Sequence, residues 1–112
     1  MTQTIFSQII EKKIPADIVY EDDLCLAFKD IHPQAPCHVL LIPKEKIDKL
    51  SSVNLSHQQL LGHLMVKAPE IAKQMGYEDF RVVINNGDQG GQEVYHLHLH
   101  ILAGRQMAWP PG

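Results

Sequence analysis

The segment from Tyr95 to Ile101 constrains the fold of this chain most, because apolar residues and histidines alternate along it. In an extended strand, successive side chains point to opposite faces of the sheet. One face would carry the apolar residues Tyr95, Leu97, Leu99 and Ile101, which can pack beneath a helix. The other would carry His96, His98 and His100, called the histidine stripe below. The pattern predicts a strand over residues 94–102 with two chemically different faces.

The histidine stripe is not explained by core packing, because each buried imidazole would need hydrogen-bond partners. A solvated strand face is a weak interpretation, since histidine is a mediocre strand residue. A zinc site is a second interpretation, because His-x-His on a strand with a third histidine offers suitable ligands. A nucleophile with supporting imidazoles is favoured, because neutral imidazole can attack phosphorus and predominates near pH 7.

A glycine-rich loop precedes the stripe at residues 85–92, with the sequence NNGDQGGQ. Glycines let backbone N–H groups approach an anion closely. The loop lacks the G-K-[ST] ending of a Walker A motif, and an ordinary hairpin turn is the alternative interpretation. Beside three histidines, this glycine loop favours a ligand that contains phosphate.

The rest of the chain shows short helix and strand patterns in mixed order. Apolar spacing predicts a short helix over 4–12 and a longer one over 54–75 that ends near Gly76. Pro69 is expected to kink the longer helix or divide it in two. Further strands are expected at 17–20, 24–30, 38–42 and 80–85. The hairpin-length connections favour an α+β fold with an antiparallel sheet.

Length and charge limit the domain count and the partners. The 112 residues suffice for one domain, and a chain this short would gain from a dimer interface. Ten Lys and Arg against thirteen Asp and Glu give a formal net charge of -3, which argues against nucleic-acid binding. The longest strongly apolar stretch, Val39–Ile42, is too short to cross a membrane.

The N-terminus and the cysteines favour a cytoplasmic location. Residues 1–10 lack the basic segment and long apolar core of a secretory signal. Cys25 and Cys37 form no C-x-x-C pair and are expected to be free thiols in a reducing compartment.

The histidine stripe resembles the signature of the histidine triad (HIT) family, His-φ-His-φ-His-φ-φ with φ apolar. Other blocks are similar, in order and spacing, to the Hint branch of that family: Thr4–Ile10, Pro33–Pro36, His38–Pro43, Gly90–Gln92 and Gly104–Gly112. The resemblance covers nearly the whole chain. It implies one HIT domain over 1–112, with a five-stranded antiparallel sheet, a short N-terminal helix, a longer central helix and a two-fold homodimer.

The resemblance also implies a function, that of a purine nucleotide-binding hydrolase of the adenosine 5′-monophosphoramidase type. Such an enzyme cleaves the P–N bond of AMP–amine conjugates and needs neither cofactor nor metal. His98 is similar to the nucleophile that forms a nucleotidyl-histidine, and His96, His100 and His38 are similar to the histidines that support it. Dinucleoside polyphosphate hydrolysis, and a nucleotide-sensing or partner-binding module without turnover, are the alternatives.

The resemblance implies a set of nucleotide contacts for AMP or GMP. Asp30 is similar to the carboxylate that holds the ribose hydroxyls, which suits an acceptor of two hydrogen bonds. The residues similar to those of the family's apolar base pocket are Ile5, Phe6, Ile9, Phe28, Ile31 and Leu40. The residues similar to the family's phosphate contacts are Asn85, Gly91 and Gln92, together with His98 and His100.

Two further positions bear on the substrate. Glu93 stands where some Hint relatives carry serine, close to the leaving group. Its negative charge would repel phosphate oxygens unless it faces solvent or a cation. Trp109, in the tail 105–112, is similar to a residue that reaches the active site of the dimer partner.

Overall fold

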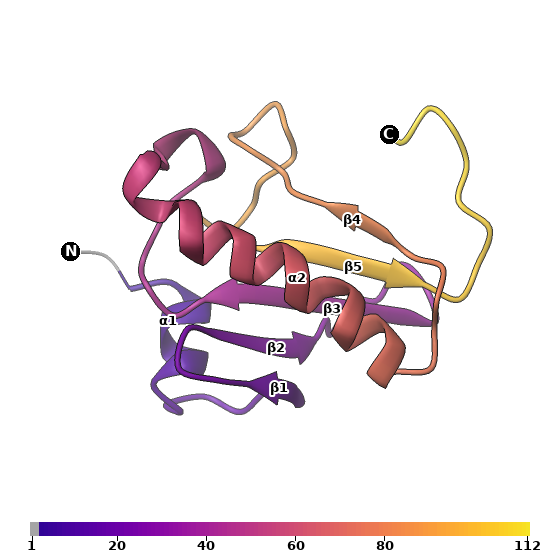
Figure 1. Ribbon diagram of the computed structural model, residues 1–112, viewed down its shortest axis with the longest axis horizontal. Coiled ribbons are helices and arrows are strands. Elements are labelled where there is room, and N and C mark those ends of the chain that lie inside the picture. The colour runs from indigo at the N-terminus through magenta and orange to yellow at the C-terminus, as the bar shows by residue number, and fades with distance from the viewer. Residues whose placement is uncertain (1–2) are drawn as a thin grey trace.

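The computed structural model describes residues 3–112 and is built on one antiparallel sheet of five strands (Figure 1). The strands are β1 (Ile18–Glu21), β2 (Cys25–Lys29), β3 (Cys37–Pro43), β4 (Arg81–Val83) and β5 (Leu99–Ala103). They follow the order β1-β2-β3-β5-β4 across the sheet, and every neighbouring pair is antiparallel. The predicted α+β fold with an antiparallel sheet is therefore confirmed.

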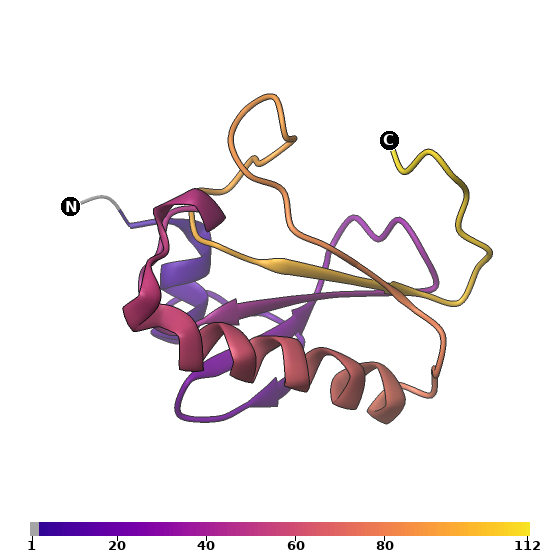
Figure 2. The same cartoon turned by 45° about the horizontal axis from the view of Figure 1, so that its top comes forward.

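The central helix α2 (Gln58–Gln74) covers one face of the sheet (Figures 1 and 2). Its buried residues are Leu64, Ala68, Ile71 and Ala72. They pack with strand residues that include Cys25, Ala27, Val39, Leu41, Leu99 and Ile101. These strand positions recur every second residue, which is the period that puts side chains on one face.

Pro69 does not divide α2 in two, so that alternative of the prediction was wrong. The helix continues through Pro69 over 17 residues. A proline inside a helix leaves the carbonyl four residues earlier without its N–H partner. Here that carbonyl belongs to Met65, and both residues are exposed, so water can replace the lost donor. The helix ends at Gln74, close to Gly76 as predicted, and Gly76 has a φ of +100°.

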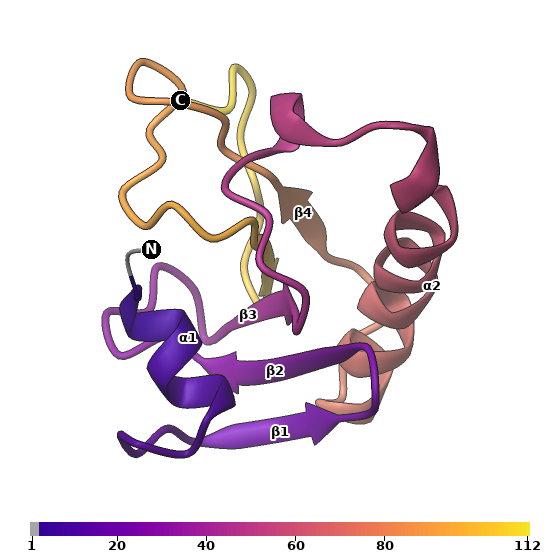
Figure 3. The same ribbon diagram turned by 90° about the vertical axis from the view of Figure 1, so that its left-hand side faces the viewer.

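The short helix α1 (Ile5–Ile10) lies on the opposite face of the sheet from α2 (Figure 3). Thr4 caps its N-terminus, because its hydroxyl accepts the Ser7 N–H. Between α1 and the sheet lies a second apolar cluster, separate from the one under α2. Its buried residues are Phe6, Ile9, Leu26, Phe28, Leu40 and Ile42. The sheet thus has the long helix α2 on one side and only the six-residue helix α1 on the other.

The last strand is shorter than the 94–102 predicted from alternation, because residues 94–98 leave the regular ladder. The Leu97 N–H donates to the Ile47 carbonyl, 2.7 Å away, instead of to a neighbouring strand. Tyr95 does not join the apolar face, since its hydroxyl donates to Asp88. His96 and His98 therefore lie on irregular backbone, and only His100 lies on β5.

Two smaller expectations concern the cysteines and the membrane. Cys25 and Cys37 are both buried free thiols, as predicted. Across residues 3–112, no helix has the length and apolar character needed to span a lipid bilayer.

Candidate active site

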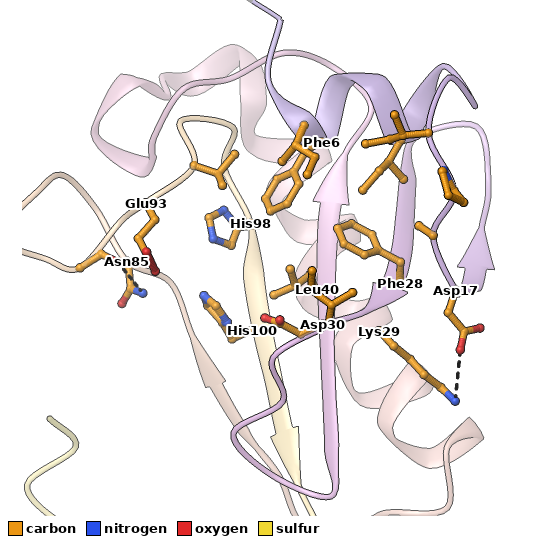
Figure 4. A pocket seen from close by; sticks show the side chains of 18 residues that line it. Phe6, Asp17, Phe28, Lys29, Asp30, Leu40, Asn85, Glu93, His98 and His100 are labelled. Carbon is orange, nitrogen blue, oxygen red and sulfur yellow. Dashed lines mark hydrogen bonds and ion pairs between the residues drawn. The ribbon is translucent and has the colours of Figure 1, made fainter.

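A cavity of about 540 Å³ opens where α1 leaves its face of the sheet uncovered (Figure 4). The predicted residues that line it are Ile5, Phe6, Ile9, Phe28, Asp30, Ile31, Leu40, Asn85, Gly91, Glu93, His98 and His100. They come from α1, from three neighbouring strands and from the glycine loop. Segments far apart in the sequence therefore meet around one concave site, as a small-molecule pocket requires.

Part of the cavity wall was not predicted from the sequence. Residues 14–17, together with Lys29 and Val94, also line it. The Lys29 ammonium lies 3.6 Å from the Asp17 carboxylate at the exposed rim. The sequence marks the first segment by Pro15, which has no N–H and follows the end of α1 at Ile10.

The apolar half of the cavity is built from aromatic rings and exposed aliphatic side chains. Phe6 and Phe28 meet edge to face, with ring centroids 5.4 Å apart. At the rim, Ile31 is 83% exposed and Ile5 is 50% exposed. Apolar side chains gathered at the mouth of a pocket are typical of a binding surface rather than a core. This half can accept a flat apolar ring.

His98 is buried at the junction between the apolar half and the histidines (Figure 4). Its Nδ1 lies 2.8 Å from the His96 backbone carbonyl. A carbonyl can only accept, so Nδ1 carries the hydrogen and Nε2 keeps its lone pair. Burial lowers the pKa of His98. The cavity thus contains a neutral imidazole with one free, nucleophilic nitrogen.

His38 and His100 form a second imidazole unit on the neighbouring strands. The Gln34 backbone N–H donates to His38 Nδ1 over 3.0 Å. The hydrogen of His38 therefore lies on Nε2, which is 2.9 Å from His100 Nδ1. His100 must accept there, so its own hydrogen lies on Nε2. That buried nitrogen has no hydrogen-bond partner among residues 3–112, so a ligand oxygen can accept from it.

Burial keeps both members of this pair neutral. The pKa of His100 falls to about 4, first because of burial and then because His98 and His38 lie nearby. Asp30 Oδ2 lies 3.5 Å from His38 Nε2. Its charge raises the pKa of His38, but burial lowers that pKa by more. Near pH 7 the Asp30 carboxylate therefore lies beside a neutral His38 ring, and the contact is not an ion pair.

His96 lies beside the site but does not line the cavity. Its Nε2 donates to the Pro43 carbonyl over 2.8 Å, which ties the irregular segment to the end of β3. Its ring also approaches Phe6 edge-on, at 6.2 Å between centroids. Burial lowers the pKa of His96. This histidine therefore supports the backbone whose carbonyl orients His98.

The glycine loop is a closed turn, which differs from its expected use as an open cradle of N–H groups. The Gly90 and Gln92 amides both donate to the Gly87 carbonyl. The Gly91 amide donates to the Asp88 carbonyl. These three N–H groups are thus occupied within the loop. The free donor beside the nucleophile is the His100 ring nitrogen instead.

Gln92 was expected to contact the phosphate, but the structure gives it a different role. It is buried, and it does not line the cavity. Its side-chain oxygen accepts the Gly87 N–H, and its nitrogen donates to the Asp48 and Val94 carbonyls. Gln92 therefore closes the glycine loop from inside, while Gly91 remains at the cavity wall.

Asn85 and Glu93 lie together on the side of the cavity away from Phe28 (Figure 4). Within residues 3–112, Glu93 has no ion-pair partner. Trp109 does not line the cavity, and 82% of its surface is exposed. The tail that carries it is held by Arg81, which donates to the Ala108 carbonyl over 2.9 Å.

Among residues 3–112, two groups of side chains bring metal-ligating atoms within 4.8 Å of one another: Asp30, His38 and His100, and Asp22, Cys25 and His63. In the first group, two of the nitrogens share a hydrogen bond that a metal would displace. In the second, burial raises the pKa of Cys25 to about 12, so the sulfur is a thiol here rather than the thiolate that binds a metal.

Comparisons with known proteins agree with this architecture. The HIT domain profile matches residues 11–107. A HIT-like protein of Synechocystis sp. is 63% identical over 110 residues, which cover 97% of this chain and 96% of the relative. A 14 kDa zinc-binding protein of Zea mays is 54% identical over 112 residues, covering 97% of this chain and 88% of the relative.

Solved structures give the same result. The crystal structure of a HIT family hydrolase from Legionella pneumophila matches with a TM-score of 0.96 and 46% identity, over 98% of this chain and 100% of that one. A HIT family hydrolase from Clostridium thermocellum matches with a TM-score of 0.92 and 39% identity, over 96% of each chain. The profile, the identities and the shared fold together show that this chain belongs to the HIT family.

Proposed function

We propose that this protein is a purine nucleotide-binding hydrolase that cleaves the P–N bond of AMP–amine conjugates. The observation that carries the proposal is His98, a buried neutral imidazole whose Nδ1 is engaged and whose Nε2 is free beside a cavity. The two structural neighbours that are named HIT family hydrolases support a hydrolytic reaction.

The cavity suggests how a nucleotide would lie in it. The purine would occupy the apolar half between α1 and the sheet, against Phe6, Phe28 and Leu40. The Asp30 carboxylate would accept the two ribose hydroxyls, since it lies between the apolar half and the histidines (Figure 4). The phosphate would then lie beside His98 and His100.

The first chemical step would form a nucleotidyl-histidine. The Nε2 lone pair of His98 attacks the α-phosphorus, the N–P bond forms and the P–N bond to the amine breaks. The amine leaves after taking one proton from solvent at the cavity mouth. His98 becomes positively charged, and the His96 carbonyl stabilises that charge through the Nδ1–H. The His100 Nε2–H would donate to a non-bridging oxygen as negative charge builds there.

The second step would return the enzyme to its starting state. Water attacks the same phosphorus, the bond to His98 Nε2 breaks and AMP is released, with one proton from the water passing to solvent. Neutral His98 is then restored without any change in its Nδ1 hydrogen bond. No residue has to be oxidised or reduced, because the chain supplies the nucleophile and the hydrogen-bond donor while solvent supplies the proton and the water.

We also propose that the protein acts as a two-fold homodimer. Trp109 is a large aromatic side chain that is almost fully exposed on one chain. Such residues are concentrated at protein interfaces. In a symmetric dimer, the tail 105–112 would bring Trp109 toward the partner's cavity, near the leaving amine rather than the purine.

A comparison of substrates tests the proposed function. Steady-state hydrolysis of an AMP–amine conjugate should exceed that of diadenosine polyphosphates and of ATP. Faster cleavage of a diadenosine polyphosphate would assign the protein to the alternative hydrolase activity. Nucleotide binding in calorimetry without turnover of any of the three would favour a sensing or partner-binding module.

A further inference from the structure

We propose that Arg105, at the start of the tail, is a positioning residue for the His38–His100 pair and acts through the backbone of Gln34. The kinetic part of this inference rests on the proposed function. Its structural part concerns only which ring nitrogens carry hydrogen, so it can be tested separately.

The contacts form one continuous chain from the surface to the cavity. Arg105 Nε donates to the Gln34 carbonyl over 2.9 Å. The Gln34 N–H donates to His38 Nδ1 over 3.0 Å. His38 Nε2 then lies 2.9 Å from His100 Nδ1. Gln34 therefore uses its two backbone groups in opposite directions, one toward Arg105 and the other toward the histidine pair.

The segment 33–36, called the proline loop here, connects β2 to β3 at the end of the sheet where β5 ends (Figure 2). Pro33 and Pro36 have no N–H with which to join a ladder. The chain that leaves β5 packs tightly on this loop. A Cβ added to Gly104, whose φ is +99°, would come within 2.8 Å of Pro36 Cβ. The start of the tail therefore packs closely against the proline loop.

The Gln34 N–H decides what the site presents to a phosphate oxygen. With that N–H on His38 Nδ1, the hydrogens lie on His38 Nε2 and on His100 Nε2. Without it, His38 could carry its hydrogen on Nδ1 and accept from His100 Nδ1. His100 would then turn a lone pair toward the phosphate instead of a hydrogen-bond donor. One backbone hydrogen bond therefore distinguishes an attractive contact from a repulsive one.

Asp30 limits the size of the expected effect. Its Oδ2 lies 3.5 Å from His38 Nε2, and a carboxylate there also favours hydrogen on that nitrogen. Loss of Arg105 alone should thus shift the tautomer population instead of inverting it. We expect kcat to fall by about tenfold, with KM within about twofold of the wild type, because the interaction affected forms in the transition state.

The first experiment compares Arg105→Ala, Arg105→Lys and Arg81→Ala. Arg81 is the matched control, since it is a half-buried arginine that also donates to a backbone carbonyl, that of Ala108. The measurements are kcat and KM for a small-amine AMP conjugate and ¹⁵N NMR of the histidine rings. In Arg105→Ala, the ring ¹⁵N signals of His38 and His100 should show a mixture of tautomers. Arg105→Lys should restore most of the wild-type signals, and Arg81→Ala should match the wild type.

A second pair of variants acts on the N–H itself. Gln34→Ala keeps both backbone groups, whereas Gln34→Pro removes the N–H that His38 accepts. Gln34→Pro should shift the ring ¹⁵N signals further than Arg105→Ala, and Gln34→Ala should leave them unchanged. Wild-type ring signals and kcat in Arg105→Ala would overturn the proposal, and wild-type ring signals in folded Gln34→Pro would show that the Gln34 N–H does not set the tautomers. If Gln34→Pro does not fold, unchanged signals and kcat in Arg105→Ala suffice to overturn it.

The outcomes separate this inference from the proposed function. A wild-type protein that hydrolyses no phosphoramidate would refute the proposed function, and the NMR comparison would still decide whether Arg105 sets the tautomers. An active wild type with unchanged tautomers and kcat in Arg105→Ala would refute the inference and leave the proposed function standing.

Discussion

His98 is oriented by the backbone of His96, not by its imidazole: His98 Nδ1 donates to the His96 carbonyl over 2.8 Å. The His96 ring faces elsewhere and donates to the Pro43 carbonyl. The stripe therefore contains three different roles at neighbouring positions. His96 anchors the backbone, His98 offers a lone pair and His100 offers a donor.

His98→Asn should reduce phosphoramidate turnover by at least about 10³-fold, as expected when a covalent nucleophile is lost. Nucleotide affinity should change little, because the aromatic and Asp30 contacts remain. Steady-state kinetics and calorimetry with AMP measure the two effects. His57→Asn is a matched control outside the cavity. A His98→Asn enzyme with a kcat near that of the wild type would exclude His98 as the nucleophile.

Stability should fall as the pH decreases from 6.5 toward 4. Burial lowers the pKa of His100 to about 4, below the value near 6.5 that it has in the unfolded chain. The unfolded state therefore binds the extra proton throughout this range. Each pH unit below 6.5 should lower the free energy of unfolding by about 1.4 kcal/mol through this histidine. Denaturant unfolding at pH 7.5 and pH 5 measures the change, and equal stability would contradict the assignment.

Activity should persist at pH values where free imidazole is already protonated. Burial lowers the pKa of His98, so its Nε2 keeps a lone pair below pH 6.5. The acidic limb of the kcat/KM profile should therefore lie below pH 6.5. A limb at or above 6.5 would mean that the group controlling the rate is a more exposed one.

Glu93→Gln should change the preference among leaving groups. The Glu93 carboxylate lines the cavity without an ion-pair partner in the described part of the chain. It can attract a leaving amine that carries an ammonium group elsewhere, and it repels phosphate. We expect kcat/KM to fall for AMP joined to one end of a diamine, whose other end is a protonated ammonium, but to hold or rise for AMP joined to an uncharged alkylamine. Equal changes for both substrates would show that the Glu93 charge does not select the amine.

Trp109→Ala should alter kcat/KM most for bulky amines and least for small ones, because we place Trp109 at the leaving-group side of the partner's cavity. The variant should still sediment as a dimer at micromolar concentration, since one tail residue contributes little of a stable interface. A monomeric wild type would remove the premise of this prediction.

Prolonged chelation should leave activity intact, because the proposed mechanism uses only side chains, water and a solvent proton. The Zea mays relative is named a zinc-binding protein, so metal analysis should accompany the assay. Activity that is lost on chelation and restored by zinc would overturn the mechanism proposed for His98.

The sequence by itself determined the layers of the fold and most of the cavity wall. The alternation of apolar residues on the strands and the three-to-four spacing on α2 are local periodicities, and each one specifies a buried face. The helix α2 likewise ended close to Gly76 as predicted, because only the local backbone has to adopt a positive φ. The resemblance at the stripe brought in residues such as Asp30, which no periodicity would have singled out.

Only the tertiary structure decided how these residues are used. The ladder ends at Leu99 because Leu97 bonds to Ile47, and Gln92 closes a loop by bonding to Asp48. The hydrogen on each imidazole is placed by a particular acceptor or donor, such as the Pro43 carbonyl or the Gln34 N–H. Hydrogen bonds of this kind join atoms that are distant in sequence and require positions within a few tenths of an ångström. The order of residues does not encode such distances, and folding of the whole sheet sets them.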